Sequence, residues 1–396
     1  MNKNNIRYIC AMTLYQLAGM MIAGSVLQAF WLENGLTQAQ VTGILSLFQL
    51  VQVGGMMLFS LMVDRIRSTL AVYRVTVILQ VVFLGSLVVL CLMRGMELNL
   101  KYAVMLGFGL FSQCVMAVHG IVDYKVPYLV MDVHEYGKIS GYVGVVYGIS
   151  GAALSAVMSW ATAAGDYNRT MMIFFGLGIG MLLAAYLVSG GFETVATAPA
   201  EPKNGQKKKV NIFKYKPFWV LLLPNFLRGL CSGVLNTAMT IGYSMGLTNQ
   251  SSGAVLTLLL QLATIIGCFI YSRISHGTNG KIILVSSLTL LVSMPAMVMG
   301  QSLILFYAMY LLANFFVNFI NYAVPTAIVE MVSYKYIGQY TSWRMLVYTL
   351  GAAVANATMT GVMEGIGVLG LMIAAAMCQV ISGIVYWWAY KKFKDA

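Results

Sequence analysis

Long runs of hydrophobic residues, separated by short polar segments, repeat along the whole chain. A helix needs about 20 mainly apolar residues to cross a bilayer. Runs such as 81–92 and 369–376 show no alternation of apolar and polar residues, which excludes a membrane β-barrel. The pattern predicts twelve membrane-spanning helices, at residues 8–31, 38–62, 70–93, 102–130, 137–162, 170–190, 217–245, 252–274, 281–300, 302–329, 336–362 and 367–390.

The composition supports this assignment. Hydrophobic residues make up 60% of the chain and charged residues 9%, with a mean hydropathy of +0.81. A soluble domain of this composition would lack the polar surface that water requires. We therefore expect an all-α integral membrane protein with short loops.

The basic residues predict how the chain is oriented. With twelve spans and both termini on the cytoplasmic side, the basic residues outside the spans fall on that side, except Arg94, Lys101 and Arg169. The formal net charge of +12 reflects this bias and does not indicate nucleic-acid binding, because no soluble domain presents the charges. We expect a multi-pass protein of the cell membrane, such as a bacterial inner membrane, in contact with lipid and monomeric.

Two halves are separated by the least hydrophobic long stretch of the chain. Residues 192–216 contain two prolines and a run of lysines, and predict a cytoplasmic linker. The expected domains are a six-helix bundle at 1–191 and a second at 217–396.

The two halves repeat each other in sequence. The segment 121–132 (IVDYKVPYLVMD) matches 320–330 (INYAVPTAIVE), and Gly35-Leu36-Thr37 answers Gly246-Leu247-Thr248. Because each half holds an even number of spans, the two copies enter the membrane in the same direction. This predicts two pseudo-symmetric bundles, the parallel-repeat arrangement of one large transporter fold.

The loop after the second span carries a degraded form of a known signature. The segment SLMVDRIRST (60–69) retains Asp64 and Arg65 from a pattern of roughly Gly-x-Leu-x-Asp-Arg-x-Gly-Arg-Arg. In this signature the chain resembles the major facilitator superfamily, and the resemblance covers its whole length. It implies twelve helices, with spans 1, 4, 7 and 10 lining a cavity, and a cytoplasmic gate. The expected gating residues are Asp64, Arg65 and, at the matching place in the second half, Arg273.

The subgroup is not indicated by these motifs. Asp123 followed by Pro127 and Tyr128 is similar to the cation-coupled glycoside symporters, but their paired acids on span two are missing. The fifth span is rich in glycine, yet Ser150 follows Ile149 where many proton-coupled drug exporters have Gly-Pro.

Ionisable residues inside membrane spans are costly and usually functional. Asp123 lies one helical turn from His119 in span four, and we expect this pair to carry a coupling proton. The alternative is that Asp123 only holds the bundle together through a neighbouring cation. Arg228 in span seven and Arg344 in span eleven are the other buried charges of interest.

Polar stripes on several spans predict a shared polar cavity, although single stripes often serve only as contacts between helices. The candidates for substrate binding on these stripes are Arg228, Arg344, Asn225, Asn318, Asn321, Tyr348 and Gln16. Cations outnumber acids inside the spans, which favours an anionic solute. Aromatic side chains such as Tyr348 also suit the rings of sugars, so a neutral sugar remains an alternative substrate.

The sequence thus predicts a secondary active transporter of a small polar or anionic solute (an organic acid, an acidic sugar or a sugar), in symport with protons. A proton-coupled exporter of drugs or amphiphilic metabolites is one alternative. A membrane enzyme or a lipid-flipping protein is another. No GxxxxGK[ST] or HExxH motif occurs, so we expect neither ATP-driven transport nor an enzyme, and no cofactor or metal.

Overall fold

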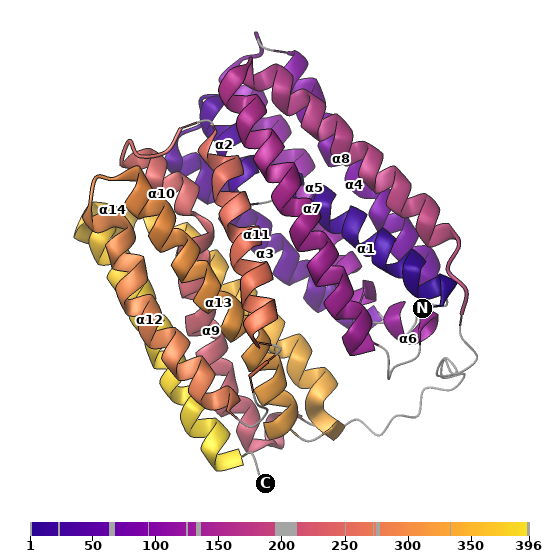
Figure 1. Ribbon diagram of the computed structural model, residues 1–396, viewed down its shortest axis with the longest axis vertical. Coiled ribbons are helices and arrows are strands. Elements are labelled where there is room, and N and C mark those ends of the chain that lie inside the picture. The colour runs from indigo at the N-terminus through magenta and orange to yellow at the C-terminus, as the bar shows by residue number, and fades with distance from the viewer. Residues whose placement is uncertain are drawn as a thin grey trace. The chain divides into compact units, whose positions relative to one another are not determined.

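The computed structural model describes residues 2–22, 24–62, 68–93, 95–123, 126–131, 136–194, 212–249, 251–271, 273–274, 278–332 and 334–393, and within them all regular structure is helical (Figure 1). The helices are α1 (Lys3–Ile22), α2 (Gly24–Glu33), α3 (Gln38–Met62), α4 (Thr69–Leu92), α5 (Leu98–Asp123), α6 (Val126–Val130), α7 (Tyr136–Ala164), α8 (Tyr167–Gly190), η3 (Ile212–Lys214), α9 (Lys216–Asn236), α10 (Ala238–Ser244), α11 (Ser252–Tyr271), α12 (Asn279–Met299), α13 (Leu303–Met331) and α14 (Tyr334–Phe393).

Eleven helical stretches are long and apolar enough to cross a membrane. The last of them, Trp343–Phe393, has 51 residues and covers most of the predicted span 336–362 and all of 367–390. Gly367, the first residue of the last predicted span, has φ 74° and ψ 171°. Only glycine adopts this backbone conformation readily, so the helix turns there. The all-α membrane fold with twelve spans is therefore confirmed.

The repeat in the sequence has a structural counterpart. Gly35 and Gly246 both have positive φ, 92° and 69°. At both sites the following leucine donates its backbone N–H five residues back, Leu36 to Trp31 and Leu247 to Gly242, over 3.1 and 2.9 Å. This is the hydrogen bond that closes a helix at a left-handed glycine. The two halves thus end their first span with the same cap.

The chain folds into two compact units. Unit 1 comprises Met1–Leu36, Val51–Lys207 and Gly253–Thr257; unit 2 comprises Thr37–Leu50, Lys208–Ser252 and Leu258–Ala396. The change from one unit to the other at 207/208 falls inside the predicted linker, 192–216. The start of α3 belongs to unit 2, where Ser46 donates a hydrogen bond of 3.0 Å to the carbonyl of Ala353. The domain limits 1–191 and 217–396 remain a prediction.

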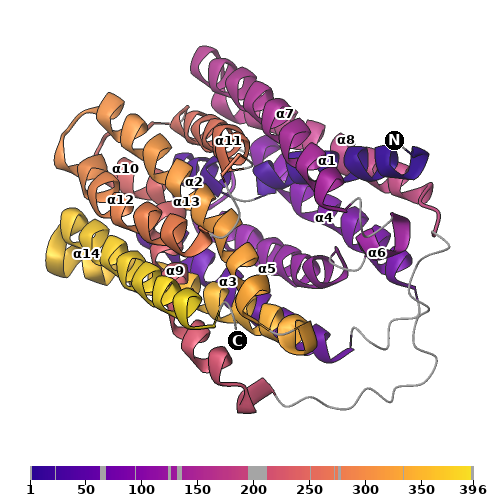
Figure 2. The same ribbon diagram turned by 60° about the horizontal axis from the view of Figure 1, so that its bottom comes forward.

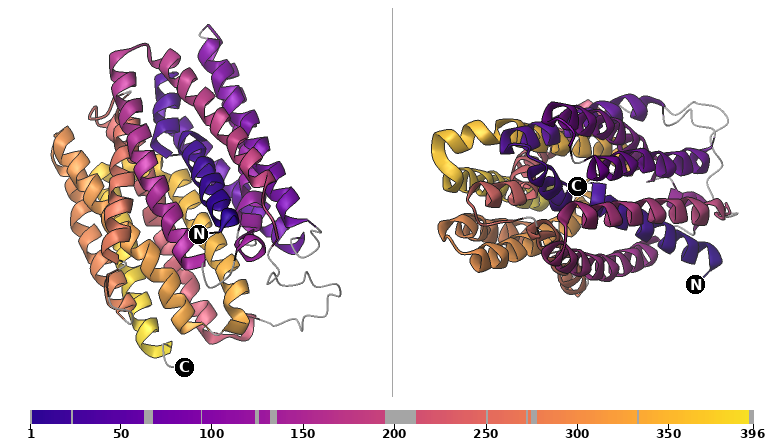
Figure 3. Two further views of the ribbon diagram at one scale, coloured as in Figure 1. Left: turned by 45° about the vertical axis from the view of Figure 1, so that its right-hand side comes forward. Right: turned by 90° about the horizontal axis from the view of Figure 1, so that it is seen from above.

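In unit 1, α1 packs against α7 and α8, and α4 packs against α5 and α8 (Figures 1 and 3). Gly178 allows α8 to approach α1 closely, because a Cβ added there would lie 2.9 Å from the sulfur of Met21 on α1. The end of α8 is tied down by polar contacts. Arg74 donates to the carbonyls of Ser189 and Gly190 over 3.0 and 3.1 Å. Cationic side chains commonly satisfy the last carbonyls of a helix in this way.

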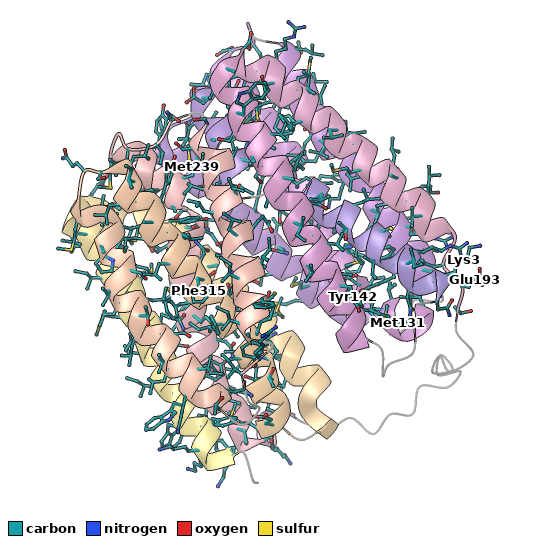
Figure 4. The ribbon with its side chains drawn as sticks, in the orientation of Figure 1. Lys3, Met131, Tyr142, Glu193, Met239 and Phe315 are labelled. Atoms are coloured by element: carbon teal, nitrogen blue, oxygen red, sulfur yellow. The ribbon has the colours of Figure 1, made fainter. Side chains whose placement is uncertain are left out.

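The N-terminal helix is fixed at the same end of unit 1. Asn4 donates to the carbonyls of Val130 and Glu193, over 2.5 and 2.6 Å, and accepts from the Glu193 N–H. Arg7 forms an ion pair of 3.0 Å with Glu193. Figure 4 shows Glu193 and Met131 beside the N-terminal Lys3. These contacts join the first helix to the ends of α6 and α8.

In unit 2, α14 packs along α9 and α12, and α12 packs against α13 (Figure 2). The α12–α14 contact is close because a Cβ at Gly383 would lie 2.7 Å from that of Ser287. Gln379 donates to the Ser287 hydroxyl over 3.0 Å at the same place. Small residues and buried polar contacts are typical of helix packing in membranes.

Candidate functional site

Arg228 is the most deeply buried arginine of the candidate site. It lies in the middle of α9 and is 8% exposed. Its Nη2 donates a hydrogen bond to Asn321 Oδ1 on α13, and its guanidinium carbon lies 5.1 Å from the centre of the Tyr348 ring on α14. Arg228 therefore joins three helices of unit 2. A guanidinium has five N–H donors, of which the contacts among the described residues use one, on Nη2.

Tyr348 and Arg344 complete this group. The Tyr348 hydroxyl donates to Ser232 Oγ over 2.6 Å, one turn along α9 from Arg228. Arg344 is half-buried, and its charge lies near enough to act on Arg228. Among the described residues, no carboxylate lies within ion-pair distance of either arginine. The two cations thus share one region of unit 2 without a described counter-ion. We call Arg228, Asn321, Arg344 and Tyr348 the arginine cluster.

Glycines explain how α9 and α14 come close enough to form this cluster. A Cβ added at Gly229 would overlap the carbonyl oxygen of Tyr348, and one at Gly351 would overlap that of Phe226. One turn further, a Cβ at Gly233 would lie 2.8 Å from that of Ala355. The two backbones touch here, and Arg228 and Tyr348 flank the crossing.

Replacing Gly229 with alanine should therefore destabilise unit 2. The added methyl group has a backbone atom in its place, and overpacking of this kind costs about 1–3 kcal/mol. Gly361→Ala on α14 is the matched control, since a Cβ there meets no heavy atom within 4 Å. The thermal unfolding midpoint in detergent should fall for Gly229→Ala and stay constant or rise for Gly361→Ala. Equal midpoints for the two variants would contradict the close crossing.

Asn225 is engaged within the protein. Its amide nitrogen donates to the Leu221 carbonyl over 2.6 Å and to the Tyr340 hydroxyl over 3.2 Å, and its Oδ1 accepts from the Tyr386 hydroxyl over 2.8 Å. The side chain has 0% exposure. These contacts fasten α9 to both halves of α14, one turn before Arg228.

Of the remaining predicted binding and gating residues, Asn318 and Arg273 have described contacts in unit 2. Asn318, 7% exposed, donates to Thr264 on α11 over 3.2 Å. Gln16 is half-buried on α1, in unit 1. Arg273 is exposed, and its guanidinium carbon lies 4.5 Å from the centre of the Phe269 ring. Asp64 and Arg65 lie outside the described residues.

His119 forms a second polar group, in unit 1. The ring stacks on Tyr15 of α1 with 4.0 Å between centroids, and the Tyr73 ring of α4 lies 4.9 Å away. Its Nδ1 lies 2.9 Å from the Thr76 hydroxyl. His119 is 4% exposed, and its Nε2 has no hydrogen-bond partner among the described residues.

Asp123 lies one turn further along α5, at its end. Its Oδ1 is buried and likewise has no hydrogen-bond partner among the described residues. The carboxylate lies near enough to act electrostatically on Tyr15 and Tyr73, the two rings beside His119. Buried polar atoms are rarely left unpaired, so two on one helical face mark a site that a proton or ligand can satisfy. We call Asp123, His119, Tyr15, Tyr73 and Thr76 the histidine cluster.

Another polar group on this helix serves packing. Ser112 donates to Gln80 Oε1 over 2.6 Å and accepts at its backbone carbonyl from Gln80 Nε2 over 3.1 Å. This reciprocal pair joins α5 to α4, two turns before His119. Tyr73 and Thr76 are not among the site residues predicted from the sequence. Their spacing with Gln80, three and then four residues, places a polar stripe on one face of α4 and could have indicated them.

Comparisons with known proteins agree with the fold. The sequence model of the Major Facilitator Superfamily matches residues 9–356. No curated protein sequence matches the chain.

Several solved structures have the same architecture. The nucleoside transporter NupG, as a D323A mutant, superposes with a TM-score of 0.70 at 12% identity, covering 99% of this chain and 100% of that one. A D-xylose-proton symporter gives 0.71 at 9% identity, covering 97% of both chains. The human organic anion transporter MFSD10 gives 0.62 at 12% identity, covering 98% of this chain and 100% of that one. At such identities the likeness concerns the fold.

Proposed function

Because the chain belongs to the major facilitator superfamily and is a secondary transporter, we propose that it moves a small organic anion, an organic acid or an acidic sugar, in symport with protons. Cytoplasmic termini, a monomeric state and a place in a bacterial inner membrane are part of this proposal. Two bundles joined by the linker at 192–216 carry the alternating access.

The observation that carries the choice of an anion is the arginine cluster. Two arginines in the membrane-spanning part of unit 2 lie near each other, and no described carboxylate pairs with either. A buried cation without a counter-ion is costly, and a bound anion removes that cost. A guanidinium binds a carboxylate through two parallel hydrogen bonds, which fixes its orientation as well as its charge.

The residues take different parts in this proposal. Arg228 and Arg344 bind the acidic group of the substrate, and Asn321 and Tyr348 orient Arg228. We assign Asn225 to fastening α9 against α14, because Leu221, Tyr340 and Tyr386 occupy its amide. Asn318 and Gln16 remain candidates for polar contacts with the rest of the substrate.

Proton coupling is assigned to Asp123 and His119, because each has a buried polar atom with no hydrogen-bond partner among the described residues. Gating is assigned to Asp64 and Arg65, on the family resemblance of their loop, and to Arg273 at the matching position. Two of the structural neighbours are sugar–proton symporters by name, a D-xylose-proton symporter and the E. coli fucose:proton symporter. This supports symport, and the named organic anion transporter supports an anionic substrate.

A thermal-shift panel tests the substrate class. The purified protein is heated with matched pairs of an acid and its neutral analogue, such as glucuronate with glucose and lactate with glycerol. A ligand present at 100 times its dissociation constant stabilises the folded state by about 2.7 kcal/mol. We expect the acids, and not their neutral analogues, to raise the unfolding midpoint, and we expect Arg228→Gln to abolish the rise. Equal stabilisation by acids and neutral partners would overturn the anion assignment in favour of a neutral sugar.

A further inference from the structure

The Thr76 hydroxyl lies between two partners, and this determines which of its atoms faces His119. The oxygen is 2.7 Å from the backbone carbonyl of Tyr73 and 2.9 Å from His119 Nδ1. A hydroxyl has one hydrogen to donate, and a carbonyl oxygen can only accept. The Thr76 hydrogen therefore points to Tyr73, and a lone pair of its oxygen points to His119.

This arrangement fixes where the imidazole hydrogen lies. Since Thr76 Oγ1 accepts, Nδ1 must donate, and in the neutral ring the other nitrogen is then an acceptor. That other nitrogen, Nε2, is buried and has no hydrogen-bond partner among the described residues. In the described part of unit 1, the lone pair of His119 Nε2 thus has no hydrogen-bond partner, and neither has Asp123 Oδ1, one helical turn away.

The rings around His119 hold it in this orientation. Tyr15 stacks on it with an angle of 24° between planes, and Tyr73 lies against it at 36°. The titratable groups around the ring are Tyr15 from α1 and Tyr73 from α4, with Asp123 one helical turn away on α5 itself. Of these, Asp123 alone is an acid with a carboxylate to protonate.

We propose that Thr76 is a positioning residue that fixes the Nδ1–H tautomer of His119, so that Nε2 shares the coupling proton with Asp123. The inference rests on the proton coupling proposed above. Side chains four residues apart on a helix are neighbours, so the two groups can meet by rotation of their side chains. In the opposite tautomer Nε2 would already carry a hydrogen and could not accept one.

Asp123 and His119 exchange one proton with water in each cycle. One proton from water binds Asp123, whose O–H then faces the Nε2 lone pair. Transfer breaks that O–H bond and forms an N–H bond, which leaves a carboxylate beside an imidazolium. The pair has no net charge in either form, and release of the proton to water restores a neutral ring and a carboxylate with one negative charge. The histidine cluster therefore changes by one charge in each transport cycle.

The tautomer can be observed directly by NMR. The full-length protein is labelled with 15N-histidine, and His119→Gln assigns the signals, since the chain has three histidines. We expect Nδ1–H in the parent and in Thr76→Ser, which keeps the hydroxyl. Thr76→Val keeps the shape and removes the hydroxyl, and should shift the tautomer ratio about tenfold towards Nε2–H, the factor that one hydrogen bond supports. An Nε2–H parent, or a Thr76→Val spectrum like that of the parent, would overturn the proposal.

Transport in proteoliposomes separates this inference from the proton coupling on which it rests. The probe is the acid with the largest shift in the thermal panel. Thr76→Val should displace the pH profile of uptake and leave counterflow intact, and Thr76→Ser should restore the parent profile. A parent-like profile for Thr76→Val, with accumulation still lost in Asp123→Asn, would overturn the role of Thr76 and leave the coupling standing. Accumulation that survives Asp123→Asn would overturn the coupling and the shared proton together, whatever the tautomer.

Discussion

Replacing Arg228 with lysine should lower uptake of the transported acid by about 10- to 100-fold. The lysine keeps the positive charge but cannot make two parallel hydrogen bonds to a carboxylate. It also gives up the guanidinium contact with the Tyr348 ring and the fixed donor to Asn321. Hydrogen bonds to charged groups contribute about 1.5–3 kcal/mol, which corresponds to this range. Initial rates in proteoliposomes, measured against substrate concentration, give the effect.

Arg169→Lys is the matched control for this prediction. Arg169 is exposed in the first turn of α8, in unit 1, so its replacement by lysine is the same chemical change outside the arginine cluster. Uptake by Arg169→Lys should equal that of the parent. Parent-like uptake by Arg228→Lys as well would mean that a point charge suffices at this position. The proposal that a guanidinium fork holds the substrate would then fail.

Replacing Asp123 with asparagine should abolish accumulation driven by a pH gradient and spare counterflow. The amide has nearly the shape of the carboxyl group but cannot bind and release a proton. A one-unit pH gradient supports about tenfold accumulation if one proton is coupled to each substrate. The variant should instead only equilibrate the substrate. The two activities are measured in the same proteoliposomes, by a pH jump and by exchange against an internal substrate pool.

Asp166→Asn is the control for the change from acid to amide. Asp166 caps α8 by accepting from the Arg169 N–H over 3.1 Å, and asparagine caps a helix about as well. Both activities should persist in this variant. Loss of accumulation and counterflow together in Asp123→Asn would assign Asp123 to substrate binding or to packing. Retention of both would end its role in coupling.

The candidate site was partly readable from residue spacing. Arg228 and Ser232 on one stripe, Asn321 on another and Arg344 with Tyr348 on a third were each visible as polar positions on one helical face. Spacing along a helix says nothing of which neighbour a side chain meets. Asn225 lies on the same stripe as Arg228, yet Tyr340 and Tyr386 occupy its amide, while Arg228 contacts Asn321 and the Tyr348 ring. The partners of the two side chains differ because each is buried against different parts of helices that are far apart in the sequence.

The membrane class, the twelve spans and the two-fold repeat could all be predicted from the sequence. The reason is that these depend on local properties: the length of apolar runs, the need to satisfy backbone groups in lipid, and glycine at left-handed caps such as Gly35 and Gly246. Only the tertiary structure decided which polar residues meet. The close crossing at Gly229 brings Arg228 to Tyr348, and the packing of α1 and α4 on α5 surrounds His119 with Tyr15, Tyr73 and Thr76. Such contacts join residues more than forty positions apart, and no periodicity along the chain encodes them.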